Sequence, residues 1–242
     1  NNIGTLEPDD KIHPLTPPAT RSPRSTLNEF LNKSRAAITI IHQVETDARQ
    51  HNRWLHKQEH IEEGNHAEEL LEQAVRTLDL SSIPEAQRLR LGLERALMLK
   101  EVLERIPLPP MQTVPGIKEV IAADKTSEDE NKLERWEIPG TEIAIVRGSK
   151  NHYVGEYLFS PETVERVPEF FAQVHDLPVT STQMKKQRNF YDYYSSTPGH
   201  MLPPRWSLWL PEWSKGQLYL DQTLWQWCAL ILTLLLASIS SA

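Results

Sequence analysis

The residues with the clearest potential for chemistry are two histidines and a glutamate near residue 60. His56, Glu59 and His60 fit the pattern H-x-x-E-H, the inverted form of a zinc-peptidase motif. Two histidines four positions apart share one helix face and can both bind zinc, and the adjacent glutamate can act as a base. Glu134 and Glu137 follow downstream as candidates for a third ligand. The neighbouring residues are polar and charged, so we interpret this segment as solvated rather than as a metal centre.

Other catalytic patterns are missing from the sequence. There is no G-x-S-x-G, and nine scattered glycines cannot build a phosphate loop. The single cysteine, Cys228, excludes an intrachain disulfide framework, and it lies in an apolar run where a thiolate would be costly. Asn32-Lys33-Ser34 fits the glycosylation pattern, but inside a predicted helix we interpret it as chance. The helix carboxylates are most simply solvated faces. We therefore predict no enzyme activity, catalytic residue, cofactor or metal.

The composition narrows the choice of partner. The chain has 242 residues, with 33 Asp and Glu against 26 Lys and Arg and a net charge of -7. Because phosphate binding needs clustered Lys and Arg, an acidic chain without a basic tract argues against a nucleic-acid partner. The length allows one large domain or two small ones with a buried core.

The end of the chain differs from the rest. Residues 222–242 contain no charged side chain and are rich in Leu and Ile. About 20 apolar residues suffice to cross the hydrocarbon of a bilayer. The segment therefore predicts a transmembrane helix over 222–242, truncated in this sequence. The alternative is a buried core helix, which is less typical of a segment that is apolar on every side.

Aromatic residues gather at and before this apolar segment. The predicted membrane-interface residues are Trp206, Trp209, Trp213, Tyr219, Trp225 and Trp227. Trp and Tyr concentrate at membrane interfaces because their rings are part apolar and part polar. Pro211 disfavours a helix at Leu210, so a bent segment in the interface is favoured over one straight helix. The alternative is a cluster of core tryptophans.

The charges beside the apolar segment predict its orientation. Between Trp206 and Thr223 there is one basic residue, Lys215, against Glu212 and Asp221. Cytoplasmic flanks carry an excess of Lys and Arg, which this flank lacks. Residues 1–221 are therefore expected on the extracytoplasmic side.

The rest of the chain predicts an α+β class. We expect a Pro-rich extended lead over 1–24, an α+β domain over 25–178, and a linker with the Trp-rich segment over 179–221. Capping boxes predict three helices, from Thr26 with Glu29 over 26–47, from Asn65 with Glu68 over 65–78, and from Ser82 with Glu85 over 84–105. Residues 48–64 are expected as a polar segment between helices.

The second part of the domain predicts strands and one more helix. Strands are expected over 117–122, 133–138, 143–146 and 153–159, with a charged loop over 124–131 and turns at Pro139-Gly140 and Gly148. Ser160-Pro161-Glu162 is typical of a helix start, and that helix is expected to end near Pro178.

Several stretches in order resemble one family. They are Ser22-Pro23-Arg24-Ser25-Thr26-Leu27, Phe30-Leu31, Leu78-Asp79-Leu80-Ser81, Ile83-Pro84, Ala96-Leu97, Leu99-Lys100-Glu101-Val102-Leu103, Trp136, Ile138-Pro139-Gly140-Thr141-Glu142-Ile143, Arg147, Tyr157-Leu158-Phe159-Ser160-Pro161-Glu162-Thr163-Val164, Pro168-Glu169-Phe170-Phe171, Asp176-Leu177-Pro178, Trp209-Leu210-Pro211-Glu212-Trp213 and Gln222-Thr223-Leu224-Trp225-Gln226-Trp227. Together they resemble the extracytoplasmic N-terminal region and first membrane helix of bacterial small-conductance mechanosensitive (MscS-like) channel proteins.

The resemblance implies a tension-gated, weakly selective ion channel in the bacterial inner membrane. It implies a homo-oligomer, a heptamer in most members, with residues 1–221 in the periplasm and the pore in further helices after Ala242. The first alternative is a single-span membrane-anchored sensor or binding module without a pore. The second is a metallopeptidase using His56, Glu59 and His60.

Overall fold

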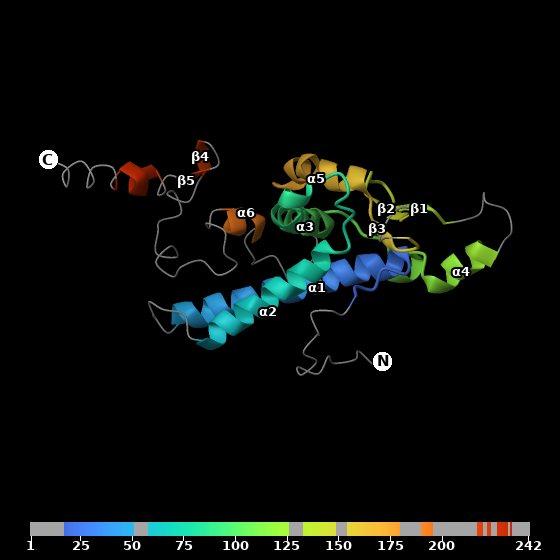
Figure 1. The fold of residues 1–242 in the computed structure, drawn as a ribbon, viewed down its shortest axis with the longest axis horizontal. Helices are drawn as coiled ribbons and strands as arrows, with labels where there is room; N and C mark the ends of the chain where they lie inside the picture. Colours follow the sequence, from blue (N-terminus) through green and yellow to red (C-terminus); the bar gives the residue numbers. More distant parts are fainter. Residues whose placement is uncertain are drawn as a thin grey trace.

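The computed structural model of the chain is an α+β fold, as the sequence predicts (Figure 1). It describes residues 17–50, 58–125, 133–148, 154–179, 190–195, 217–219, 222–223, 227–231 and 233. The named helices are α1 (Pro23–Gln50), α2 (Gln58–Val75), α3 (Arg88–Arg105), α4 (Ile117–Lys125), α5 (Pro161–Val174) and α6 (Phe190–Ser195), with 3-10 turns η1 (Glu85–Gln87) and η2 (Met111–Thr113). The strands are β1 (Arg135–Glu137), β2 (Ala144–Arg147), β3 (Tyr157–Phe159), β4 (Gln217–Tyr219) and β5 (Gln222–Thr223).

Helix α1 begins earlier than the predicted capping box at Thr26. The hydroxyl of Ser22 accepts the backbone N–H of Ser25 at 3.2 Å, and the hydroxyl of Ser25 accepts the N–H of Ser22 at 2.9 Å. Pro23 fills the first helical position, where a missing N–H costs nothing. Thr26 is thus inside the helix, and its hydroxyl donates to the carbonyl of Tyr157 at 2.6 Å. The residue predicted to cap α1 instead ties it to the sheet.

Helix α2 begins at Gln58, not at the predicted Asn65, and lies beside α1 (Figure 1). The buried ring of His60 brings its Nε2 to 2.9 Å from Oδ2 of Asp47 on α1. Much of the predicted polar segment 48–64 is therefore helical, because its polar side chains form the solvent face of a helix whose other face meets α1. Residues 51–57 lie outside the described residues.

The predicted helix over 84–105 is a 3-10 turn followed by α3. Pro84 and Gln87 precede η1 and α3, and neither makes a side-chain capping hydrogen bond, so the predicted Ser82–Glu85 capping box is wrong. The carboxylate of Asp79 orders the preceding turn by accepting the N–H of Ser81 at 2.9 Å. Local turn chemistry therefore replaces the expected cap.

The predicted antiparallel meander is confirmed. The strand order is β1-β2-β3, with Trp136 opposite Ile145 and Ile145 opposite Phe159. At the predicted turn, Gly140 has φ +77, a value that L side chains rarely adopt. The outer edge of β3 is bonded to the helical part, since Phe159 donates its N–H to the carbonyl of Thr77 at 2.9 Å.

The strand predicted over 117–122 is wrong, because these residues belong to α4. Their apolar side chains recur at i, i+3 and i+4, which is helical spacing. The Glu119 carboxylate accepts the N–H of Gly116 at 2.8 Å, which closes the first turn. Asp124, predicted in a loop, is near the end of α4 and pairs with Arg147 of β2 at 2.6 Å. Side-chain contacts at both ends thus hold α4 as a helix.

The predicted helix start at residue 160 is confirmed. The Ser160 hydroxyl accepts the N–H of Thr163 at 3.1 Å, and Pro161 occupies the first turn of α5. This hydroxyl is the first cause that lowers the pKa of the Glu162 carboxyl. Every part of this start lies within four consecutive residues, which is why the sequence predicts it.

The core surrounds α3, which packs against α1, α2, α5 and α6. From Met98 to Arg105, every residue of α3 is buried. Phe190 of α6 also joins the core with 2% of its surface exposed, although it lies in the range predicted as linker. The central position of α3 thus encloses its charged residues together with its apolar ones.

The C-terminal part begins with a small hairpin of β4 and β5. Gln222 and Thr223 form β5, so the predicted helix does not begin at residue 222. Residues 227–231 and 233 are helical. Within the residues that the structure describes, no helix is both long enough and apolar enough to cross a membrane.

Candidate functional site

The structure describes only part of the predicted membrane interface. Trp206, Trp209, Trp213 and Trp225 lie outside the described residues, Tyr219 is the last residue of β4, and Trp227 is the first residue of the helical stretch 227–231. Trp227 is half-buried, and its indole nitrogen has no hydrogen-bond partner among the described residues. The six aromatic residues as a membrane interface remain a prediction.

The helical stretch after Trp227 presents apolar side chains to its surroundings. Leu230 is 51% exposed and Ile231 is 54% exposed. Neither residue belongs to the cluster of buried side chains around α3. These two residues are thus not core residues of the described domain.

The H-x-x-E-H residues do not form a site among the described residues. His56 lies outside them, Glu59 is exposed, and His60 is buried against Asp47. The candidate third ligand Glu137 pairs with its neighbour Arg135 on β1 at 2.8 Å. No group of three or more His, Cys, Asp or Glu side chains in the described part of the chain is arranged to hold a metal ion.

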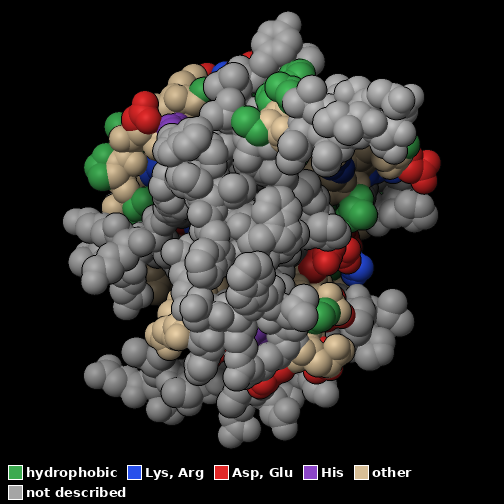
Figure 2. All heavy atoms as spheres, turned by 90° about the vertical axis from the view of Figure 1, so that its left-hand side faces the viewer, with side chains coloured by type: hydrophobic (Ala, Val, Ile, Leu, Met, Phe, Trp, Pro, Cys, Tyr) green, Lys and Arg blue, Asp and Glu red, His purple; other side chains and the backbone are tan. Residues whose placement is uncertain are grey.

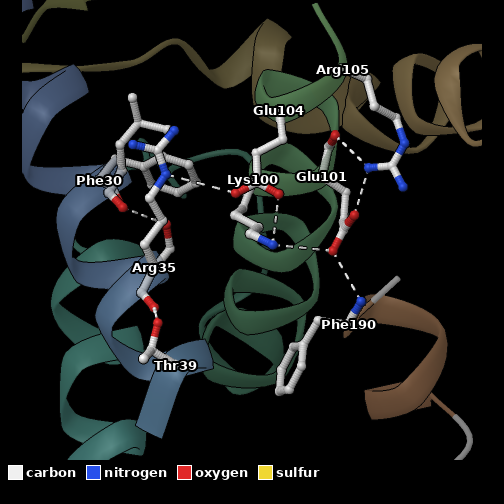
Figure 3. Close-up of polar contacts among 10 residues, drawn as sticks. Phe30, Arg35, Thr39, Lys100, Glu101, Glu104, Arg105 and Phe190 are labelled. Atoms are coloured by element: carbon white, nitrogen blue, oxygen red, sulfur yellow. Dashed lines mark hydrogen bonds and ion pairs between the residues drawn. The ribbon is translucent and has the colours of Figure 1, made fainter. Parts of the chain in front are cut away.

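A buried cluster of charged residues, which we call the α3 charge cluster, is the most unusual feature of the described residues (Figure 3). It consists of Lys100, Glu101, Glu104 and Arg105 of α3 with Arg35 of α1. The four α3 side chains are each at most 4% exposed. The helix carboxylates predicted as solvated faces are, at these two glutamates, inside the protein.

The contacts in the α3 charge cluster join successive helix turns. Nζ of Lys100 lies 2.8 Å from Oε2 of Glu104 and 3.4 Å from Oε1 of Glu101. Nη1 of Arg105 lies 2.5 Å from Oε2 of Glu101 and also donates to that residue's carbonyl. Arg35 reaches Glu104 from α1 with 3.7 Å between Nε and Oε1. Each buried carboxylate thus faces two cations.

Burial dominates the electrostatics of one of these carboxyls. The pKa of Glu104 is raised, first because burial disfavours its charged form. The neighbouring Lys100 acts in the opposite direction, by charge and by its hydrogen bond, without cancelling the effect of burial. The charge cluster therefore costs stability through desolvation and recovers part of that cost through its contacts.

Helix α6 docks on the α3 charge cluster. The N–H of Phe190 donates to Oε1 of Glu101 at 3.0 Å, the contact drawn at the lower right of Figure 3. The Phe190 ring meets the His42 ring edge-to-face at 6.1 Å, and the Tyr191 ring meets the Phe171 ring at 5.1 Å. These contacts hold the residues just before the Trp-rich segment on the folded domain.

Partial burial of α6 extends to its last turn. The pKa of Tyr194 is raised, first by burial and then by the negative charge of Glu94. The same carboxylate accepts a hydrogen bond from the hydroxyl of Tyr191 at 3.4 Å. Phe190, Tyr191 and Tyr194 of α6 therefore all face side chains of α3.

A shallow groove of about 380 Å³ runs along α1, lined by Thr39, His42, Gln43, Thr46, Asp47 and Gln50. On the face in Figure 2, the described hydrophobic, acidic and basic side chains are interspersed. The single cysteine, Cys228, is exposed and has no disulfide.

Sequence reasoning missed the α3 charge cluster. Its pattern, Lys-Glu-x-x-Glu-Arg over 100–105, gives two pairs at i, i+4. Such pairs stabilise exposed helices as well as buried ones, so the pattern does not reveal burial. A second signal was available in the apolar residues Leu99, Val102 and Leu103 between the charges. They leave the helix few positions that can face water.

Comparisons of the chain with protein-family models, with characterised proteins and with solved structures find no match. The resemblance to MscS-like proteins therefore rests on the ordered motifs of the sequence alone.

Proposed function

We propose that the chain is the extracytoplasmic N-terminal part of a tension-gated channel subunit of the bacterial inner membrane. In this proposal the subunit is MscS-like, assembles as a homo-oligomer and passes ions with little selectivity through a pore formed outside these residues. The folded domain would rest on the bilayer surface through the Trp-rich segment. Its role would be to set the gating threshold or to support assembly.

The observation that carries the proposal is the apolar C-terminal segment behind a folded domain. Residues 222–242 have no charge, and the described residues Leu230 and Ile231 lie exposed outside the core. Exposed apolar side chains beside Trp-rich sequence are favourable in lipid and costly in water. A channel that opens under tension needs such ties, because its membrane area must differ between closed and open states.

The docked α6 supports a mechanical role for the domain. It lies between the core and the Trp-rich segment in the chain, and it is fixed to α3 through Glu101. A segment tied on one side to a folded core and on the other to lipid can transmit a displacement between them.

The test is electrical recording from the complete reading frame in bacterial membrane patches. Suction should open channels in patches from cells that express it. Deletion of residues 1–200 should leave conductance intact but shift the pressure threshold or the subunit assembly. A deletion that changes neither property would contradict the role of the domain.

A membrane-retained protein without tension-activated current would contradict the channel and favour the single-span module instead. Zinc in the purified protein, lost in His60→Ala, would favour the metallopeptidase. The same preparation, analysed by native mass spectrometry, measures subunit number, for which we expect a homo-oligomer.

A further inference from the structure

We propose that Glu101 latches α6 to the domain, and that α6 releases as a unit while the α3 charge cluster and the rest of the core stay intact. The inference starts from the length of α6. It has six residues, Phe190–Ser195, and a helix this short does not persist alone in water. Its helical state therefore depends on its contacts with α3, α1 and α5.

The contacts of α6 are of two kinds. The aromatic contacts include Phe190 on His42 and Tyr191 on Phe171. The polar contacts include the hydrogen bond from the N–H of Phe190 to the Glu101 carboxylate at 3.0 Å and the longer one from the Tyr191 hydroxyl to the Glu94 carboxylate at 3.4 Å. A hydrogen bond to a buried charged acceptor is about twice as strong as one between neutral groups. Among the described residues, Glu101 thus makes the strongest single polar contact to α6.

The partners of Glu101 make release of α6 possible without unfolding. When α6 leaves, Oε2 keeps Arg105 at 2.5 Å, and Oε1 keeps Lys100 at 3.4 Å. No buried charge is left without an opposite charge, which is the event that makes breaking a buried ion pair costly. The released N–H of Phe190 gains water as its partner. Release therefore costs the hydrogen bonds to Glu101 and Glu94 and the burial of the Phe190 ring, whereas the ion pairs of the α3 charge cluster are kept.

We infer that the contact between Glu101 and α6 resists a pull from the membrane, and this step rests on the proposed function. The chain runs from α6 at 190–195 to the Trp-rich segment that begins at Trp206. A pull on membrane-attached residues would reach α6 before any other described element of the domain. The latch would then set how much displacement the domain tolerates before it separates from the membrane segment.

Hydrogen exchange of the full chain in lipid nanodiscs tests the latch. In the unmodified protein, amides of 190–195 should exchange by a local opening that leaves α3 protected. Glu101→Gln keeps an acceptor for Phe190 but makes it neutral, so exchange of 190–195 through local opening should become about fivefold faster. The change also weakens the ion pair of Arg105, so exchange of α3 through global unfolding should rise as well, and a weaker denaturant dependence for 190–195 than for α3 identifies the local opening. The matched control is Glu104→Gln, which neutralises the same charge cluster one turn away without touching α6. It should change exchange of 190–195 less than about twofold.

Two results would overturn the latch. One is an equal acceleration by the Gln variants of Glu101 and Glu104, which would mean that the cluster acts only through overall stability. The other is exchange of 190–195 only together with α3. Exchange of the unmodified protein in rising denaturant measures this second point even if the variants fail to fold. Opening of α6 should then show a weaker denaturant dependence than opening of α3.

Electrical recording separates the latch from the channel. In the complete reading frame, Glu101→Gln should lower the pressure threshold, and Glu104→Gln should not. An accelerated exchange with an unchanged threshold would overturn the force role of the latch. Absence of any tension-activated current would overturn the proposed function, whereas the exchange result would stand on its own.

Discussion

Two groups of ion pairs in this protein have the same chemistry and different surroundings. In the α3 charge cluster, Lys100 lies between Glu101 and Glu104, and all three side chains are at most 4% exposed. On the surface, Arg166 of α5 pairs with Glu142 and Glu169, and all three side chains are at least 44% exposed. Each group has one cation that serves two carboxylates.

The difference teaches that burial, rather than the number of contacts, decides what an ion pair contributes. At the surface, water and salt screen the charges, and holding long side chains in place costs entropy. Inside the protein, desolvation is expensive, and the remaining partner of a broken pair is left charged in an apolar environment. The same substitution should therefore have large effects in the α3 charge cluster and almost none around Arg166.

The largest effect is expected for Glu101→Ala. It removes the partner of Arg105 and the acceptor of Phe190, and it leaves Lys100 with Glu104 only. We expect the free energy of unfolding to fall by about 3–5 kcal/mol. Chemical denaturation followed by circular dichroism measures it. The control is Arg90→Ala on the same helix, whose side chain is 70% exposed and which should cost less than about 1 kcal/mol. Similar losses for both variants would break the comparison.

A second, smaller effect is expected for Lys100→Met. Both carboxylates lose a cation, but Glu104 keeps Arg35 and Glu101 keeps Arg105. We expect a loss of about 2–3 kcal/mol of unfolding free energy. The double variant Lys100→Met with Glu104→Gln removes both charges and should recover most of this loss. A double variant less stable than Lys100→Met would show that the pair itself stabilises the fold.

The pH dependence of stability sharpens the comparison further. Because burial raises the pKa of Glu104, the folded state holds its proton at a higher pH than the unfolded state does. The favourable contribution of this group is full below the ordinary glutamate pKa of about 4.3 and is lost as pH rises through the raised value. Glu104→Gln should lack this loss. Denaturation midpoints of the two proteins should therefore diverge as pH rises from the ordinary glutamate pKa through the raised value, and should run parallel above it. Curves that are parallel over the whole pH range would contradict the raised pKa.

The smallest effect is expected for Arg166→Ala. Its guanidinium is exposed between Glu142 and Glu169 and lies over the Phe170 ring at 4.9 Å. The melting temperature should stay within measurement error, because exposed pairs of this kind rarely contribute measurably. Addition of salt should change the unmodified protein and the variant equally. A clear loss of stability would mean that this surface group acts as a network.

The parts of the fold that the sequence predicts correctly depend on neighbouring residues. Ser160 caps α5 because its hydroxyl, the following proline and the accepting N–H are within four residues. The meander follows from β-branched strands and from Gly140, which adopts the positive φ that the turn requires. The prediction of a strand over 117–122 was wrong because a short apolar run fits a strand and a helix equally well. Contacts from Arg24 and Arg147 to the two ends of α4 favour the helix there.

The candidate site was predictable only in part. The membrane segment and its aromatic flank follow from composition and remain predictions, with Trp227 the only tryptophan of that flank among the described residues. The docking of α6 on Glu101 joins residues 89 positions apart in the sequence. No local sequence pattern predicts this contact, because the contact depends on which helix lies at the centre of the fold.

The sequence by itself therefore determined the helix start at residue 160, the meander and the uncharged C-terminal segment. It did so because caps, turns and residue periodicity act over a few positions of chain. Only the tertiary structure decided that α3 is enclosed and that its charged residues lie inside. Burial is set by which elements cover a helix, and the same Lys-Glu-x-x-Glu-Arg pattern is stable in water or in a core. The packing of other elements around α3 therefore determines whether Glu101 is a solvated carboxylate or a buried acceptor for α6.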